Sequence, residues 1–303
     1  MLLNIRKVDN KMITKRKNKI NRPPVSERIY LLVFFLIFLV FGATLVYPLI
    51  WALLNAGKTG VEYIEAPFAF PTSYLFQNFV KAFSNLIYNG TSFLEMYWNS
   101  IWMSTVQVVA SVMSSALVAY VMSKYKFPGK KVLYAIAIFI QVVPIVGSGA
   151  AKFKFLAETG LLDNPWLYWL SWLNGFDFNF LVLLGYFNSI SWGYAESAFM
   201  DGATDFQVFR RIMLPQAKGA VGALMLTTFV SVWDDYSTSL LYMKSYPTAA
   251  LGIYAFRTES LYLGNSMPLM FAAIILTIVP AIVLYACSQK MILENVSVGG
   301  LKG

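Results

Sequence analysis

Long apolar runs separated by short polar stretches dominate this chain of 303 residues. A transmembrane helix needs about 20 predominantly apolar residues, because each residue rises about 1.5 Å and the hydrocarbon core of a bilayer is about 30 Å thick. We therefore expect an all-α polytopic membrane protein with six transmembrane helices, the fourth of them interrupted by polar residues. The predicted spans cover residues 29–54, 98–122, 132–151, 170–190, 219–243 and 268–288.

The first predicted span follows a basic arm, an arrangement that also occurs in signal peptides. The apolar run of residues 29–54 is far longer than the roughly 7–15 residues of a signal peptide's apolar region, so we expect it to be retained. The chain then divides into a cytoplasmic arm (1–28), a six-helix membrane domain (29–290) and a cytoplasmic tail (291–303). Residues 55–95 are mixed in character and are expected to form an external loop.

Composition supports a membrane protein and excludes several kinds of site. The chain is 58% hydrophobic and 13% charged, with a mean hydropathy of +0.59, whereas a soluble domain carries about 25% charged residues. With one cysteine and no histidine, the chain cannot build a Cys/His zinc site or a histidine-dependent hydrolytic site. It also lacks the glycine-rich phosphate-binding motif of nucleotide hydrolases. We expect neither an enzyme nor a bound cofactor.

The distribution of charge predicts the orientation in the membrane. If both termini, the 123–131 connection and the 191–218 connection lie on one side, that side holds 18 of the 24 Lys and Arg residues and 6 of the 15 acids. Its net charge is then +12, against −3 for the remainder. Because cytoplasmic loops are enriched in Lys and Arg, both termini should be cytoplasmic. The basic arm has no motif typical of nucleic-acid binding, which favours a solvated arm.

The polar connection 191–218 contains a segment with its own helical pattern, AESAFMDGATDFQVFRRIMLPQA at residues 195–217. Its apolar residues recur at helical spacing. Gly202 stands where a left-handed residue would end one helix, and Pro215 where a second helix would stop. The pattern predicts helix, turn and helix with aromatic side chains on a cytoplasmic surface. Such a patch can dock a protein partner or pack into lipid headgroups, and the pattern alone does not separate these.

Several motifs of this chain resemble those of permease subunits in bacterial ATP-binding-cassette (ABC) importers. The residues that match the family's EAA loop are Glu196, Ser197, Ala198, Gly202, Ile212, Leu214 and Pro215. The stretch 196–215 is similar to the loop of carbohydrate importers typified by the smaller permease of the maltose transporter. Three further stretches agree in order along the chain: GLLDN at 160–164, SVWDDY at 231–236 and VGGLKG at 298–303.

This resemblance implies the type I ABC importer permease fold and a particular assembly in the bacterial inner membrane. The chain would pair with a second homologous permease above two cytoplasmic ATPases, which bind ATP and Mg, and an extracytoplasmic binding protein would deliver the sugar. The EAA loop would seat in a cleft of one ATPase, and residues 299–303 would reach the seam between the two ATPases. The implied coupling residues are Glu196, Ser197, Ala198, Asp201, Gly202, Phe206, Phe209, Ile212, Leu214 and Pro215.

The match to the family is incomplete at three positions. Ser197 replaces a common Ala, which exchanges one small residue for another. Asp234 replaces a common Asn and Gly185 replaces a frequent Arg, so the residues that line the substrate pathway are expected to differ.

Polar and aromatic residues at membrane depth are the candidates for that pathway. A carboxylate inside a span is costly and rarely faces lipid, so it is either functional or held by a structural contact. The structural reading of Asp234 and Asp235 is a helix cap or a pair with Lys152 or Lys154. Aromatic side chains such as Tyr186 could stack on sugar rings, although packing explains most of them. The candidate pathway residues are Asp177, Asn179, Trp233, Asp234, Asp235 and Tyr236.

The resulting hypothesis is a permease that moves a carbohydrate, typically an oligosaccharide, into the cytoplasm by alternating access. The alternative from a different class is an ion-coupled secondary transporter, which would need no ATPase and could use Asp234 or Asp235 as a proton site. That alternative leaves the pattern of residues 195–217 unexplained.

Overall fold

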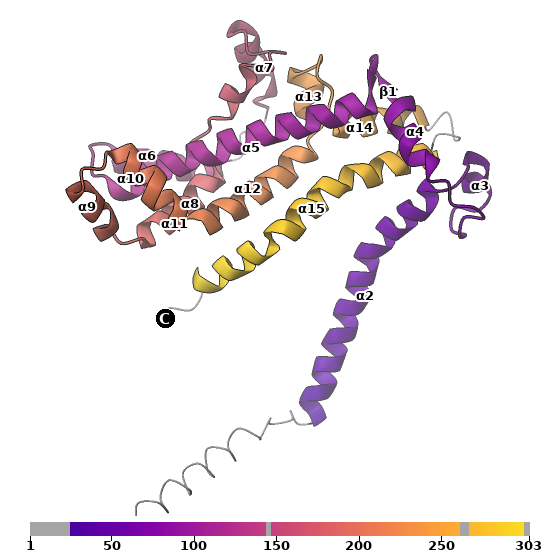
Figure 1. The fold of residues 1–303 in the computed structure, drawn as a ribbon, viewed down its shortest axis with the longest axis horizontal. Helices are drawn as coiled ribbons and strands as arrows, with labels where there is room; N and C mark the ends of the chain where they lie inside the picture. Colours follow the sequence, from indigo (N-terminus) through magenta and orange to yellow (C-terminus); the bar gives the residue numbers. More distant parts are fainter. Residues whose placement is uncertain (1–24, 144–146, 261–266, 300–303) are drawn as a thin grey trace, which may run out of the picture. The chain divides into compact units, whose positions relative to one another are not determined.

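The computed structural model describes residues 25–143, 147–260 and 267–299 (Figure 1), without the side chains of residues 25–26, 258–260 and 290–299. The chain divides into two compact units between Ala52 and Leu53. The expected arm 1–28 lies mostly outside the described residues, as do residues 300–303 of the tail.

The first unit contains most of helix α2 (Val25–Ala56). Its apolar side chains are exposed on every side from Ile29 to Phe41. A helix that is hydrophobic all round is typical of a membrane span. The first predicted span is thus one continuous helix of 32 residues, slightly longer at both ends than expected.

The expected external loop is a small folded layer. It contains α3 (Gly60–Glu65), α4 (Gln77–Asn85) and an antiparallel hairpin of β1 (Ile87–Tyr88) and β2 (Thr91–Ser92). Lys58 is 1% exposed and donates a 2.8 Å hydrogen bond to the Ala66 carbonyl. Burial lowers the pKa of Lys58, while the nearby Glu62 carboxylate raises it. These contacts explain how a polar segment keeps a defined shape beside the membrane helices.

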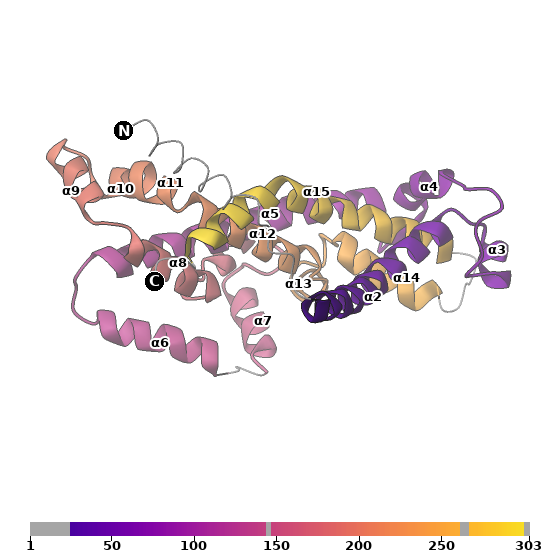
Figure 2. The ribbon, with the colours of Figure 1, turned by 90° about the horizontal axis from the view of Figure 1, so that it is seen from below.

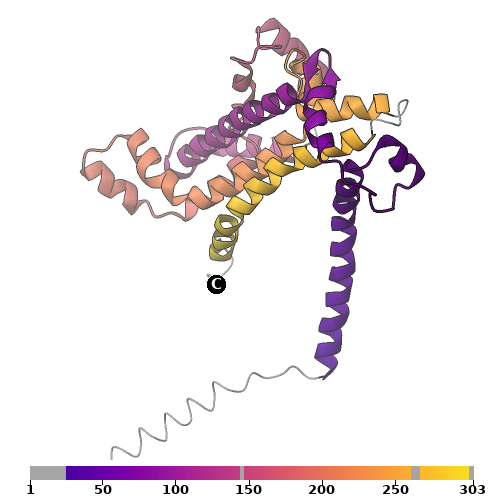
Figure 3. The same ribbon diagram turned by 45° about the vertical axis from the view of Figure 1, so that its right-hand side comes forward.

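Helix α5 (Phe93–Lys124) is the central element of the second unit. It starts with a capping box, in which the Ser92 hydroxyl accepts from the Glu95 N–H and the Glu95 carboxylate accepts from the Ser92 N–H. Helices α12 (Lys218–Trp233) and α15 (Met267–Gly299) run beside it (Figures 1 and 3), with α12 in contact with both of its neighbours. α8 (Phe178–Ser189) covers another side of α5, and α14 (Ala249–Ser260) lies near the end of α5 that begins at Phe93 (Figure 2).

Three predicted spans are broken in the structure. The third consists of α6 (Lys130–Val142) and α7 (Gly149–Glu158), the fourth of a 3-10 turn, η1 (Tyr168–Trp172), and α8, and the fifth of α12 and α13 (Ser237–Tyr242). Two breaks contain glycines in the left-handed region, Gly147 at φ +85° and Gly175 at φ +49°, a conformation that ends a helix. Among the described residues, three helices are long and apolar enough to cross a membrane: 27–56, 93–124 and 267–289.

Candidate functional site

The segment predicted to dock a partner has the expected helix–turn–helix form. It comprises α9 (Gly193–Met200), α10 (Asp205–Val208), a π-helical turn η2 (Phe209–Met213) and α11 (Leu214–Gln216). We call this segment the coupling loop. Gly202 adopts φ +82°, as expected of a left-handed residue after a helix, and its N–H donates to the Phe199 carbonyl at 3.0 Å. Thr204 and Gln207 then form a capping box that starts α10.

Pro215 does not stop the second helix, contrary to the prediction from the sequence. It lies in the first turn of α11, where the missing N–H of proline is tolerated. Just before it, the Leu214 N–H bonds to the Phe209 carbonyl, which is the wider spacing of a π-helix. In a regular α-helix, residue 215 would donate its N–H to the carbonyl of Arg211, and proline has no N–H to donate. The π-helical turn therefore lies directly before the position where the α-helical hydrogen bonds are interrupted.

The coupling loop has an inner face and an outer face. Ala195, Ala198, Val208 and Met213 are buried in a core built from α5, α8 and α12. The outer face exposes Phe206 (62%) and Met200 (88%), and the sequence analysis did not single out Met200. The other exposed residues predicted to couple are Glu196, Ser197, Asp201, Gly202 and Pro215.

Phe209 was predicted to contact an ATPase, but the structure places it in the core. Its side chain is 5% exposed, and its ring lies 5.1 Å from that of Tyr120 in α5. Ile212 and Leu214 are half-buried against the same core. The exposed apolar surface of the segment is therefore smaller than expected, and its largest exposed side chains are Phe206, Met200 and Tyr194 of α9.

Asp177 and Asn179 join three helices and do not stand free. The Asp177 carboxylate accepts from Ser115 at 2.7 Å and Ser111 at 3.0 Å, and it caps α8 through the Phe180 N–H. The Asn179 amide donates to Asp177 and to Thr228 of α12. The structure thus assigns these two pathway candidates to an interhelical network. Tyr186 likewise donates to a backbone carbonyl, that of Gln216.

Trp233 and Asp235 are also held by structural contacts. Trp233 is 5% exposed and donates to the Thr277 carbonyl at 2.9 Å. Asp235 accepts from the N–H groups of Ser237 and Thr238 and from the Ser237 hydroxyl, which fixes the start of α13. Asp235 is therefore held by local contacts with the first residues of α13 and does not cap a neighbouring helix.

The two lysines considered as partners of these acids make other contacts, although Lys152 lies within electrostatic reach of Asp235. Lys154 pairs with Glu158 at 3.7 Å. The ammonium of Lys152 lies 5.0 Å from the ring centre of Tyr242 and 5.5 Å from that of Trp172, within cation–π range. Among the described residues, neither lysine forms an ion pair with Asp234 or Asp235.

Asp234 and Tyr236 remain exposed at the break between α12 and α13. The Tyr236 ring stacks on Tyr254 of α14, with centroids 4.3 Å apart and planes 9° apart. Tyr254 is 45% exposed and was missed by the sequence analysis, because nothing in the sequence relates it to residues 231–236. The Asp234 carboxylate forms no hydrogen bond or ion pair with any described residue, although its backbone N–H donates to the Val232 carbonyl. Asp234 and Tyr236 are therefore the candidate pathway residues whose side chains are exposed in the structure.

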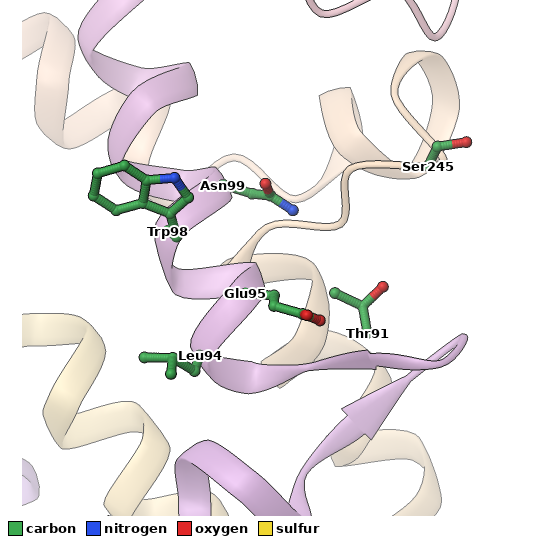
Figure 4. Close-up of a pocket in the computed structure, with 6 residues that line it drawn as sticks. All are labelled: Thr91, Leu94, Glu95, Trp98, Asn99 and Ser245. Carbon is green, nitrogen blue, oxygen red and sulfur yellow. The ribbon is translucent and has the colours of Figure 1, made fainter.

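A hollow of about 450 Å³ lies near the end of α5 that begins at Phe93 (Figure 4). Its polar side chains are largely occupied: Asn99 donates to the Pro247 carbonyl, and Ser245 donates to Asp163 of the GLLDN stretch. Trp98 and Leu94 project to one side of the helix, away from Thr91 and Ser245. The hollow lacks converging free polar groups. No cluster of three His, Cys, Asp or Glu side chains suited to a metal occurs in the described part of the chain.

Comparisons with known proteins agree with this geometry. The family model described as binding-protein-dependent transport system inner membrane component matches residues 114–298, which include the coupling loop. The diacetylchitobiose uptake system permease protein NgcG of Streptomyces coelicolor is 24% identical over 277 residues, which are 90% of either chain. The maltodextrin transport system permease protein MalD of Streptococcus pneumoniae is 28% identical over 264 residues, 86% of this chain and 91% of that one.

Solved structures show the same fold. A bacterial ABC transporter involved in the import of the acidic polysaccharide alginate contains a chain that matches with a TM-score of 0.72 at 26% identity, covering 88% of this chain and 98% of that one. The structure of a bacterial alginate ABC transporter with an alginate pentasaccharide-bound periplasmic protein matches with a TM-score of 0.60 at 19% identity, covering 88% and 94%.

Proposed function

The chain belongs to the family of binding-protein-dependent transport system inner membrane components, and from this premise we propose that it is a permease subunit of an ABC importer for oligosaccharides. The observation that carries the proposal is the coupling loop, whose Gly202 turn and exposed outer face lie inside the region that matches the family. Two related permeases are named for diacetylchitobiose and for maltodextrin. Both of these compounds are oligosaccharides.

An importer of this kind needs subunits for ATP hydrolysis, for the membrane pathway and for sugar delivery. The chain lacks a phosphate-binding loop, so ATP hydrolysis requires separate ATPase subunits. The outer face of the coupling loop, with Glu196, Met200 and Phe206, is a suitable surface for one of them. A second permease would complete the pathway, and an extracytoplasmic binding protein would supply the sugar. The alginate transporter bound to a periplasmic protein supports this last partner.

We assign the exposed residues at the break between α12 and α13, namely Asp234, Tyr236 and the neighbouring Tyr254, to the sugar pathway. A carboxylate without a partner at membrane depth is costly against lipid, so Asp234 should face water or substrate. The stacked rings of Tyr236 and Tyr254 beside it offer flat apolar surfaces suited to the C–H faces of a sugar. Asp177, Asn179, Trp233 and Asp235 would then maintain the helix arrangement around this pathway.

Reconstitution tests the proposed function. Proteoliposomes containing the full complex should accumulate oligosaccharide only when ATP and the binding protein are both present, and vanadate should stop accumulation. Collapse of the ion gradients should leave transport unchanged. Transport by this chain without an ATPase, driven by an ion gradient, would instead establish the secondary-transporter alternative.

We further propose six membrane crossings in the bacterial inner membrane with both termini in the cytoplasm. Cys287 is exposed, so labelling experiments need a Cys287→Ser background. In that background, Lys81→Cys in the exposed part of α4 should react with an impermeant thiol reagent added to cells with a permeable outer envelope. Lys130→Cys at the start of α6 should react only after the membrane is opened. Labelling of the second site from outside would contradict this topology.

A further inference from the structure

The cytoplasmic end of α5 is attached to the coupling loop at two places and to the chain just before it at a third. The Lys124 ammonium donates to the Ile190 carbonyl at 2.6 Å, just before the loop begins. The hydroxyl of Tyr125, the residue that ends α5, donates to Asp205 Oδ1 at 2.5 Å in the middle of the loop. The Tyr120 ring packs on Phe209 of the π-helical turn.

Neighbouring aromatic side chains hold Tyr125 in position for its hydrogen bond to Asp205. The Tyr125 ring lies edge-on to Trp192 and to Tyr120, with centroids 5.9 and 5.7 Å away. The Tyr120 and Tyr125 hydroxyls are 3.2 Å apart. An apolar hollow of about 360 Å³, bordered by Leu117, Val121 and Phe206, adjoins the bond. Burial, together with the hydrogen bond to Asp205, raises the pKa of Tyr125. The phenol therefore stays protonated and donates to the carboxylate.

The other end of α5 is attached to the outer segments of the protein. Tyr97 donates to the Leu276 carbonyl at 3.2 Å, and Asn99 donates to the Pro247 carbonyl at 3.1 Å. The Ser100 hydroxyl accepts from the Ala249 N–H at 2.8 Å, at the start of α14. Between these two ends, α5 runs for 32 residues without a proline or glycine, so it has none of the usual positions at which a helix bends.

We propose that Tyr125 and Asp205 are positioning residues that tie the coupling loop to α5, so that movement of the loop reaches the outer end of the protein through this helix. The proposal rests on the proposed function, in which the loop responds to an ATPase. The other predicted spans in contact with the loop are less direct routes, because α8 is only 12 residues long and α12 ends at Trp233.

The Tyr125–Asp205 bond is not needed to fold the loop. The turn at Gly202 and the Thr204 capping box are formed within the loop itself, and the buried residues of α9 and η2 attach it to the core. Removal of one phenolic hydroxyl leaves those contacts in place. A transport defect in Tyr125→Phe would therefore result from impaired transmission of movement and not from misfolding of the loop.

The test measures sugar transported per ATP hydrolysed by the full complex in proteoliposomes, together with its melting temperature. Tyr125→Phe and Asp205→Ala should each lower this ratio by about tenfold, the factor expected for one hydrogen bond to a charged group, with an unchanged melting temperature. The double variant should be no worse than either single variant, because both remove the same bond. Asp205→Asn, which keeps an acceptor oxygen, should recover most of the ratio.

Tyr186→Phe is the matched control, since it also removes a tyrosine hydroxyl that bonds to the loop, but from α8. It should keep the wild-type ratio. An unchanged ratio in Tyr125→Phe, additive losses in the double variant, an equal loss in Tyr186→Phe, or failure of both single variants to assemble would overturn the proposal. Failure of the wild-type complex to couple ATP to transport would instead refute the proposed function itself.

Discussion

Gly202→Val should abolish most of the ATP hydrolysis that the binding protein stimulates, while the protein remains in the membrane. Gly202 has φ +82°, a conformation that costs an ordinary residue about 1–2 kcal/mol and is worse for a β-branched one. A Cβ at this position would meet no atom within 4 Å, so the expected effect comes from backbone strain and not from a clash. To relieve that strain, the turn must change and move α9 relative to α10. Glu196 and Phe206 would then no longer present one surface.

Gly202→Asn is the matched control, because asparagine is the side chain that best tolerates the left-handed region. We expect near-normal stimulation in this variant, because the site is exposed and a Cβ there would meet no atom within 4 Å. The measurement is ATP hydrolysis with and without binding protein in proteoliposomes of the full complex. Normal stimulation in the valine variant, or equal loss in both variants, would show that the turn conformation is not what matters.

Asp177→Ala should lower the stability of the membrane domain by about 2–3 kcal/mol. The substitution removes a helix cap, which contributes about 1 kcal/mol, and hydrogen bonds to Ser111, Ser115 and Asn179. Side-chain hydrogen bonds between membrane helices contribute about 0.6 kcal/mol each. The loss should separate α8 from α5, and it would be detected as a lower melting temperature of the purified complex.

Asp234→Asn is the comparison, because Asp234 makes no such contacts with the described residues. This variant should melt at the wild-type temperature and transport sugar several-fold more slowly, since a carboxylate accepts hydrogen bonds from sugar hydroxyls at both oxygens. If Asp177→Ala were stable but inactive, Asp177 would belong to the pathway after all. If Asp234→Asn were stable and fully active, the pathway would not include this side chain.

The coupling loop could be predicted from the sequence because its signals are local. A glycine in the left-handed region, a Thr204–Gln207 capping box and apolar residues at helical spacing act within a few residues of one another. The span of α2 was predictable for a similar reason, since hydrophobicity on every side leaves lipid as the only suitable surroundings.

The breaks in the third and fifth predicted spans were not predictable in this way, whereas the fourth was expected to be interrupted by polar residues and is broken there. Hydropathy measures how strongly a segment prefers an apolar environment to water. It does not indicate the residue at which a helix ends. At Asp177, the polar end of α8 is tolerated inside the protein only because two serines of α5, more than 60 positions away in the chain, donate to the carboxylate. Such a partner exists only once the helices have packed.

The tertiary structure also decided which aromatic side chains face outward. Phe206 and Phe209 are three residues apart, so a regular helix would place them on the same side. They do lie on one side, with ring centroids 6.4 Å apart, but the ring of Tyr120 in α5 covers Phe209 and leaves Phe206 exposed. The sequence by itself determined that this chain lies in a membrane and carries a helix–turn–helix segment between two of its spans. Packing against α5 determined which residues of that segment remain exposed, because burial depends on neighbours that are distant along the chain.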